Sequence, residues 1–292
     1  MSNKPSFVLT RPASRQQGLI EVLTGQGMTV LALPALTIEP LIEAFIEPFI
    51  APSIKSLNET SIAPDIIKSD FKFYNLIVFV SRAAVEHFPS DFHPDLNQTH
   101  MAAVGGRTAL AIRQRFGPLA TVLYSPEGAR QDSEALWPVL KPALTSLSRV
   151  LIVRAETGRN WLRDQFMTKG CQVDVMAVYN RKPCVWSAEQ VQTLNAALTS
   201  KVPLIWLFTS AESVEAVVSQ LNVLGVQASQ AIQGVVATHP KILERVSRLL
   251  ATVNFDDLSN KKPGTFTPYQ VVAPCEQEIL QGLLKLSKFL QS

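Results

Sequence analysis

The sequence predicts an α/β fold of two similar units, each a parallel sheet with helices on both faces. The first observation is an internal repeat, because Phe7–Pro40 and Val150–Pro183 share one pattern of apolar run, arginine, helix-like segment, glycine and second apolar run. The identical positions are Arg11/Arg154, Leu19/Leu162, Gly27/Gly170, Val30/Val173 and Pro40/Pro183. The second observation is that Leu76–Glu86 matches Ile205–Glu215 further downstream. A repeat of this length indicates duplicated domains rather than a solenoid.

Composition limits the class of protein. The chain has 292 residues, of which 47% are hydrophobic and 17% charged, enough for two domains with their own cores. A polar start that turns directly into a strand predicts no signal or transit peptide. The most apolar window, Met28–Ala51, contains three prolines and three glutamates, which argues against a membrane span. Cys171, Cys184 and Cys275 lack metal or redox spacing, so we expect reduced thiols in the cytoplasm.

The charge pattern indicates the kind of ligand. The net charge is +3, and the lysines and arginines are scattered instead of forming a basic stripe. Nucleic-acid binding is therefore not expected, because it needs a clustered basic surface. The charge permits a polyanionic small molecule without requiring one.

The first repeat defines the order of the elements. Phe7–Leu9 is a continuous apolar run, typical of a strand buried on both faces of a parallel sheet. Ser14 is the predicted N-cap of a helix over Arg15–Gln26, which ends at Gly27. Thr29–Leu33 is the second strand, and Ala35–Pro40 is a further extended piece.

Residues 41–72 form an insertion, because the second copy has no equivalent after Pro183. The apolar spacing of Leu41–Ile46 is helix-like, and prolines interrupt the stretch that follows. A surface excursion is the simplest interpretation of such a segment.

The rest of the chain continues the alternation of strands and helices. Further strands are predicted at Phe73–Val80, His100–Val104, Ala120–Tyr124, Leu204–Phe208, Gly234–Thr238 and Val271–Ala273, and the second strand–helix–strand repeat is expected to run from Arg149 to Tyr179. Helices are predicted at Ala83–Phe88, Arg107–Phe116, Ser133–Leu140 with Asp132 as cap, Ala188–Leu198, Ala211–Leu221, Lys241–Leu250 and Glu276–Leu290. Asn254–Thr267 reads as a polar loop.

The candidate binding residues follow the strands. Ligands of open α/β sheets bind beyond the carboxyl ends of the strands, where helix N-termini attract anions. The loops at these positions carry serine, threonine, glycine and arginine, which suits an anionic ligand. The candidates are Arg11, Ser81, Gly105, Thr108, Arg154 and Ser210.

Each candidate also has a purely structural interpretation. Ser81, Thr108 and Ser210 can be helix N-caps. Gly105 with Gly106 can be a turn that requires positive φ. Arg11 and Arg154 can be salt-bridge partners.

No common catalytic motif is present. The sequence lacks GxSxG, HExxH, CxxC, GxGxxG and the P-loop, and its four histidines keep no useful spacing. Tyr179, at the expected end of a strand, is the best candidate proton donor. A phenol is a weak acid, useful where a leaving group needs modest help. The alternative is an aromatic side chain that only packs at a sheet edge.

Seven segments together carry a family resemblance over nearly the whole chain: VLTRPASRQ, LIVFVSRAAVEHF, AVGGRTA, PEGARQDSEAL, VLIVRAETGRNWL, GCQVDVMAVYNRKP and LFTSAESV. In this order and spacing they resemble uroporphyrinogen-III synthases. The resemblance implies two α/β domains joined by a two-strand connection, with residues 1–37 and 182–292 in one domain and 38–181 in the other. It also implies a substrate cleft between the domains.

The resemblance implies a reaction as well. It is a cofactor-independent and metal-independent cyclising hydro-lyase step of porphyrin and heme biosynthesis. Linear hydroxymethylbilane, with eight carboxylates, loses water and closes with inversion of the last pyrrole ring through a spiro intermediate. The enzyme would mainly hold the substrate in one folded shape. A non-catalytic two-lobed α/β protein that binds a polyanion or a tetrapyrrole is the alternative.

The resemblance also assigns residues and partners. Tyr179 matches the tyrosine suspected of helping the hydroxyl leave, and the candidate serines, glycine, threonine and arginines fall on or near the cleft loops. The sequence departs from the family at Thr238-His239-Pro240-Lys241, where His239 or Lys241 would meet a carboxylate instead of a threonine. A monomer is implied, without nucleic-acid or membrane partners. A transient contact with the preceding pathway enzyme is compatible with this assignment.

Overall fold

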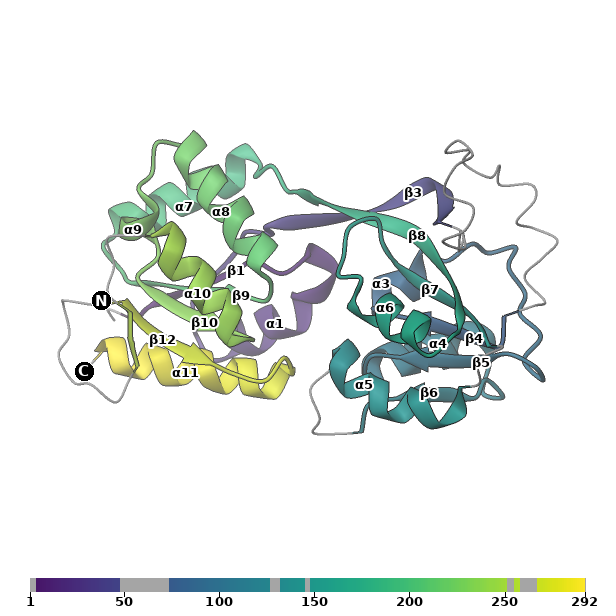
Figure 1. Ribbon diagram of the computed structural model, residues 1–292. Coiled ribbons are helices and arrows are strands. Elements are labelled where there is room, and N and C mark those ends of the chain that lie inside the picture. Colours follow the sequence, from purple (N-terminus) through teal and green to yellow (C-terminus); the bar gives the residue numbers. More distant parts are fainter. Residues whose placement is uncertain are drawn as a thin grey trace. The chain divides into compact units, whose positions relative to one another are not determined.

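The computed structural model describes residues 4–47, 74–126, 132–144, 148–250, 255–257 and 267–291. The chain divides into two compact units. Met1–Thr37 and Lys182–Ser292 form one, here called the terminal unit, and Ile38–Arg181 form the other, the central unit (Figure 1). Each unit is built on a six-stranded sheet.

The sheet of the terminal unit has the strand order β11-β12-β10-β9-β1-β2. Its strands are β1 (Ser6–Leu9), β2 (Val30–Ala32), β9 (Leu204–Phe208), β10 (Gly234–Ala237), β11 (Phe255–Asp257) and β12 (Thr267–Val271). Every neighbouring pair is parallel. β1 pairs Phe7 with Val30 on one side and with Ile205 on the other, which places it inside the sheet.

Helices cover both faces of this sheet. They are α1 (Gln17–Gly25), α7 (Ala188–Thr199), α8 (Ala211–Val223), α9 (Ala228–Ala231), α10 (Pro240–Leu249) and α11 (Glu276–Gln291), and a 3₁₀ turn at Ala13–Arg15 precedes α1. Phe7 and Leu9 pack in a core with α1 and α11, whereas Val8 packs in a second core with α7, α8 and α10. Because successive strand residues face opposite cores, the strand must be apolar throughout.

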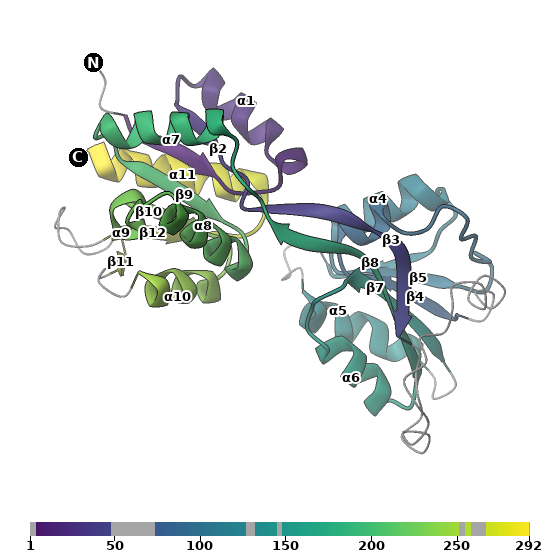
Figure 2. The same cartoon turned by 90° about the horizontal axis from the view of Figure 1, so that it is seen from above.

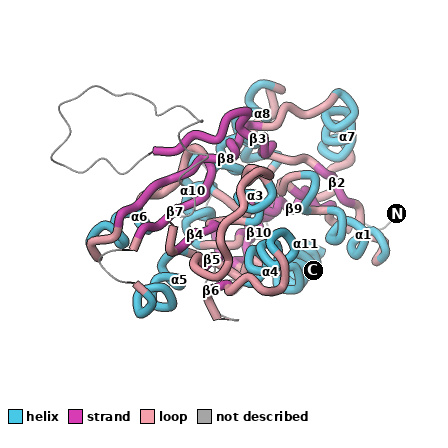
Figure 3. Tube along the Cα trace, turned by 90° about the vertical axis from the view of Figure 1, so that its right-hand side faces the viewer, coloured by secondary structure: helices cyan, strands magenta, loops and turns pink. Residues whose placement is uncertain are grey.

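The sheet of the central unit has the order β3-β8-β7-β4-β5-β6. Its strands are β3 (Leu36–Glu47), β4 (Leu76–Phe79), β5 (His100–Ala103), β6 (Val122–Tyr124), β7 (Arg149–Ala155) and β8 (Gln172–Pro183). The helices are α3 (Arg82–Glu86), α4 (Gly106–Phe116), α5 (Ser133–Leu140) and α6 (Trp161–Thr168), with a 3₁₀ turn at Lys141–Ala143. Figure 3 shows α5 and α6 on one side of β4, β5 and β6, and α3 and α4 on the other.

The two structural units do not coincide with the two sequence repeats, because each unit contains strands from both. The terminal unit combines β1 and β2 of the first repeat with β9, β10 and β12 of the second. The central unit combines β7 and β8 of the second repeat with β4, β5 and β6 of the first. β3 and β8 lie side by side and each continues from one unit into the other, so two strands connect the units (Figure 2). This confirms the predicted fold class.

The shared glycines of the repeat have a backbone reason. Gly27 follows α1 with φ of 70°, and Gly170 follows α6 with φ of 80°. This left-handed conformation ends a helix and is costly for any residue with a Cβ. The two positions therefore require glycine in both copies.

Several predicted elements need correction. Ser14 lies inside the 3₁₀ turn, because the Arg15 N–H already bonds the Pro12 carbonyl, and the N-cap of α1 is Gln16. Leu41–Ile46 belongs to β3 and not to a helix, since pairing with β8 outweighs its helix-like spacing. The rest of the insertion, residues 48–73, lies outside the described residues.

Differences also occur near the C-terminus. The predicted loop at Asn254–Thr267 contains β11, which pairs with β12. The last strand begins at Thr267 and ends at Val271, earlier than predicted. The short helix α9 has no clear signal in the sequence and was not predicted.

A buried polar network lies at the amino ends of β7 and β8. The Asp174 carboxylate, 3% exposed, accepts hydrogen bonds from the Tyr74 hydroxyl at 2.8 Å and from Arg149 Nε at 3.1 Å. The Arg149 guanidinium lies 4.8 Å from the centroid of the Tyr74 ring. Burial raises the pKa of Tyr74 above its ordinary value, and the Asp174 carboxylate adds to this effect.

This shift predicts a loss of stability in alkali. Tyr74 keeps its proton in the folded protein at a pH where the unfolded chain, with a tyrosine pKa of about 10, has lost it. The unfolded state then binds fewer protons, so the free energy of unfolding falls as pH rises above about 10, by up to about 1.4 kcal/mol per pH unit. Urea unfolding between about pH 8 and 11 should show this slope in the wild type and a smaller one in Tyr74→Phe. Equal slopes in the two proteins would contradict the assignment.

Candidate active site

The candidate residues lie at the carboxyl ends of parallel strands, here called the carboxyl edge of each unit. In the central unit Ser81 follows β4, Gly105 follows β5, and Arg154 lies near the end of β7. In the terminal unit Arg11 follows β1, Ser210 follows β9, and His239 follows β10. Because β5, β4 and β7 are parallel neighbours in one sheet, and β1, β9 and β10 are parallel neighbours in the other, each group shares one edge of its own sheet.

The structure joins two of the candidates directly. The Tyr179 hydroxyl lies 3.0 Å from Ser81 Oγ, a hydrogen-bond distance in which either atom can donate. Ser81 Oγ also accepts from the Ala84 N–H at 3.1 Å and is thereby the N-cap of α3. The Tyr179 side chain is 5% exposed, and its ring centroid lies 6.1 Å from that of His87. The candidate proton donor is therefore held by a hydroxyl group and not by a charged residue.

A β-bulge directs Tyr179 toward Ser81. Arg154 pairs with Ala177, but Ala155 pairs with Tyr179, so Val178 is an extra residue in β8. Met176, Val178 and Tyr179 all belong to the core under α3 and α4. In regular alternation Tyr179 would face the opposite core, with Val175. Tyr179 also lies inside β8, which runs on to Pro183, and not at the end of the strand as predicted.

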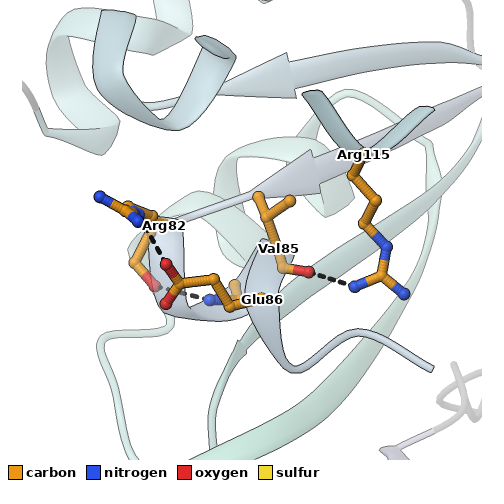
Figure 4. Close-up of polar contacts among 6 residues, drawn as sticks. Arg82, Val85, Glu86 and Arg115 are labelled. Carbon is orange, nitrogen blue, oxygen red and sulfur yellow. Dashed lines mark hydrogen bonds and ion pairs between the residues drawn. The ribbon is translucent and has the colours of Figure 1, made fainter. Parts of the chain in front are cut away.

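The helix that carries Ser81 is held at its other end by Arg115. The Arg115 guanidinium donates to the carbonyl oxygens of Val85 and Phe88 at 2.5 Å and of Pro89 at 2.8 Å. Figure 4 shows the Arg115 side chain directed at the Val85 carbonyl, and the Arg82–Glu86 ion pair on the same helix. Burial lowers the pKa of Arg115. Sequence reasoning missed this residue, because nothing in its local pattern indicates a partner 30 positions away.

In the terminal unit, two candidates at the carboxyl edge, Ser210 and His239, are helix caps. Ser210 Oγ accepts from the Ser213 N–H at 3.1 Å in a reciprocal capping box at the start of α8. His239 Nδ1 accepts from the Lys241 N–H at 3.1 Å at the start of α10. The Lys241 side chain is exposed. The N-cap interpretation of Ser210 is confirmed, and His239 has the same role at the next strand.

The structural predictions for Gly105, a positive φ, and for Thr108, a helix N-cap, are both wrong. Gly105 has φ of −170° and ψ of 169°, an extended backbone open to any residue, so the predicted positive φ is wrong. Its carbonyl accepts from the N–H groups of Thr108 and Ala109, and Gly105 is itself the N-cap of α4. Thr108 lies in the first turn of α4 and is 6% exposed, so it is not the cap.

The two repeat-related arginines have different surroundings. Arg11 Nη1 lies 4.0 Å from Glu276 Oε1 at the start of α11, and the Arg11 side chain is 11% exposed. Arg154 Nη1 donates to the Arg159 carbonyl at 3.2 Å and to Asn160 Oδ1 at 3.0 Å. Arg11 therefore forms an ion pair with a glutamate in the first turn of α11, whereas Arg154 binds the loop that precedes α6.

The part of the chain that the structure describes offers little for other kinds of site. There, no group of three or more histidine, cysteine or acidic residues could hold a metal ion. Among the described helices, none has the length and apolar character needed to cross a membrane. Cys171, Cys184 and Cys275 are not disulfide-bonded, and burial raises the pKa of the first two.

Comparisons with known proteins match this architecture. Residues 17–249 match the family model described as uroporphyrinogen-III synthase HemD. A mutant uroporphyrinogen III synthase of Thermus thermophilus is 14% identical, with 98% of this chain and 99% of that chain covered and a TM-score of 0.53. The uroporphyrinogen-III synthetase of Helicobacter pylori is also 14% identical, with 97% and 99% covered and a TM-score of 0.52. The two structures share the fold, and the family match spans most of the sequence. The chain belongs to the uroporphyrinogen-III synthase family.

Proposed function

We propose that the chain converts linear hydroxymethylbilane to uroporphyrinogen III, with loss of water and inversion of the last pyrrole ring through a spiro intermediate. The observation that carries this proposal is the Tyr179 phenol held 3.0 Å from Ser81, in a chain of this family. The reaction needs one weak acid and a surface that holds a polyanion. The carboxyl edge of the central unit offers both.

The substrate carboxylates would be bound mainly by backbone dipoles. Helices α3, α4, α8 and α10 begin at the two carboxyl edges. Each helix N-terminus presents N–H groups and a partial positive charge that favours an anion. Arg11, Arg154 and Lys241 add full charges beside them. We assign substrate binding to these residues with Ser210, Gly105, Thr108 and His239.

The chemical role of Tyr179 is to assist the departure of the hydroxyl group. Its phenol would transfer a proton to that hydroxyl as the carbon–oxygen bond breaks, so that water leaves. The cation that remains is stabilised by the adjacent pyrrole nitrogen. Because hydroxymethylbilane also closes unaided to the uninverted isomer, the protein must above all hold the chain in the shape that leads to inversion.

The proposal also includes the cellular compartment and the oligomeric state of the protein. Three cysteines that are not disulfide-bonded suit a reducing compartment, which supports a cytoplasmic enzyme. Each unit covers both faces of its sheet with its own helices, which supports a monomer.

The proposal is tested by product identity. Purified protein is incubated with hydroxymethylbilane, and the oxidised products are separated by chromatography. The expected result is the type III isomer with the protein and the type I isomer without it. A protein that binds the substrate but leaves only type I would instead be a non-catalytic tetrapyrrole binder.

A further inference from the structure

The hydrogen-bond capacity of Ser81 limits what it can do. A serine hydroxyl has one hydrogen to donate and can accept two hydrogen bonds. One acceptor position is used by the Ala84 N–H at 3.1 Å, and the Tyr179 hydroxyl lies at 3.0 Å. These two contacts leave Ser81 little capacity for a substrate carboxylate, the role that the sequence suggested.

The direction of the Ser81–Tyr179 bond decides whether Tyr179 can act as an acid. If Tyr179 donates, its proton points at Ser81 and away from any substrate. If Ser81 donates, the phenol proton remains for the departing hydroxyl. A proton donor needs its hydrogen directed at the acceptor, so only the second arrangement is productive.

We propose that Ser81 is a positioning residue that donates its hydroxyl hydrogen to Tyr179 Oη, which directs the phenol proton toward the hydroxyl group of the substrate. The inference rests on the proposed function and refines it. The Ala84 N–H, the Ser81 hydroxyl and the Tyr179 phenol then form one chain of donors, each polarised by the one before.

The proton transfer balances along this chain. The O–H bond of Tyr179 breaks and its electron pair stays on Oη, while the proton moves to the substrate hydroxyl. The carbon–oxygen bond of the substrate breaks with its pair on oxygen, and water leaves. The Ser81 donor stabilises the negative charge that develops on Oη. After ring closure the pyrrole carbon releases a proton, which restores the phenol.

Two further features hold the Ser81–Tyr179 hydrogen bond in place. The bulge at Val178 turns Tyr179 to the face where α3 begins. Arg115 binds the Val85 carbonyl in the last turn of α3 and the Phe88 carbonyl just after the helix, so the segment that begins at Ser81 is also held at its far end. A hydroxyl on such a support keeps its orientation without help from the substrate.

The test compares two substitutions at Ser81. Ser81→Gly removes the hydroxyl but keeps an acceptable N-cap, whereas Ser81→Thr keeps a hydroxyl. For type III formation we expect kcat of Ser81→Gly to fall about tenfold with KM within about twofold of wild type. Ser81→Thr should recover most of the rate. In the Tyr179→Phe background, Ser81→Gly should have no further effect, because the group it positions is gone.

Ser187→Gly is the matched control, since Ser187 caps α7 in the same way and lies outside the proposed site. It should keep the wild-type kcat. The proposal is overturned if Ser81→Gly leaves kcat unchanged, or raises KM alone as a carboxylate ligand would. It is also overturned if the effects of Ser81→Gly and Tyr179→Phe multiply. A wild-type protein that forms no type III isomer would defeat the proposed function itself, a different outcome.

Discussion

Tyr179→Phe is expected to lower kcat for type III formation by about a hundredfold, because loss of a positioned general acid typically costs this much. KM should stay near the wild-type value. The Tyr179 ring packs in the core under α3 and α4, and phenylalanine preserves that ring, so the fold should persist. Initial rates of type III formation at several substrate concentrations measure both constants.

Tyr269→Phe is a suitable control for this experiment. Tyr269 lies in β12 of the terminal unit, packs against the core of that unit, and has no proposed part in catalysis or binding. Loss of the hydroxyl group of this control tyrosine should leave kcat unchanged. Full turnover by Tyr179→Phe would remove the catalytic role of the phenol, while the assignment of the overall reaction would survive.

Asp174→Ala is expected to lower the free energy of unfolding by about 3 kcal/mol, since it breaks a buried ion pair and leaves its partners unsatisfied. Asp174 accepts from both Tyr74 and Arg149, and only the Arg149 side chain has substantial exposure. The network lies at the amino ends of the strands, opposite to the carboxyl edge. The folded variant should therefore keep its kcat.

Urea denaturation measures the loss directly. Asp91→Ala, at an exposed aspartate of the same unit, is the control and should change stability by less than about 0.5 kcal/mol. If Asp174→Ala changes stability as little as this control, the network contributes nothing to the fold.

The sequence predicts well those elements whose signals are local. Leu204–Phe208 is a strand with the bounds expected from its apolar run, and Asp132 caps a helix over Ser133–Leu140 as predicted. The helix-like interpretation of Leu41–Ile46 was wrong, because this segment forms a strand only by pairing with β8, which is far along the chain. Where pairing partners are distant in sequence, local spacing is a poor guide.

The candidate site was also predicted only in part, because its contacts join residues that are distant in the sequence. The predicted strand ends drew attention to Ser81 and Tyr179, although Tyr179 lies inside β8. Their contact depends on the bulge at Val178, which belongs to the register of two strands and leaves no local pattern. The repeat also suggested equal roles for Arg11 and Arg154. Their neighbours differ, because Glu276 lies outside the repeated segments and Asn160 takes the place of Gln17 in the first copy, so one arginine forms an ion pair and the other binds a loop.

The central claim is that this chain directs ring closure to the inverted isomer, and the most direct test is the type III fraction at fixed substrate and increasing protein concentration. Enzymatic closure competes with spontaneous closure, so the fraction should rise from zero without protein toward one. Tyr179→Phe should need much more protein to reach the same fraction. A fraction that stays at zero at every wild-type concentration would contradict the account.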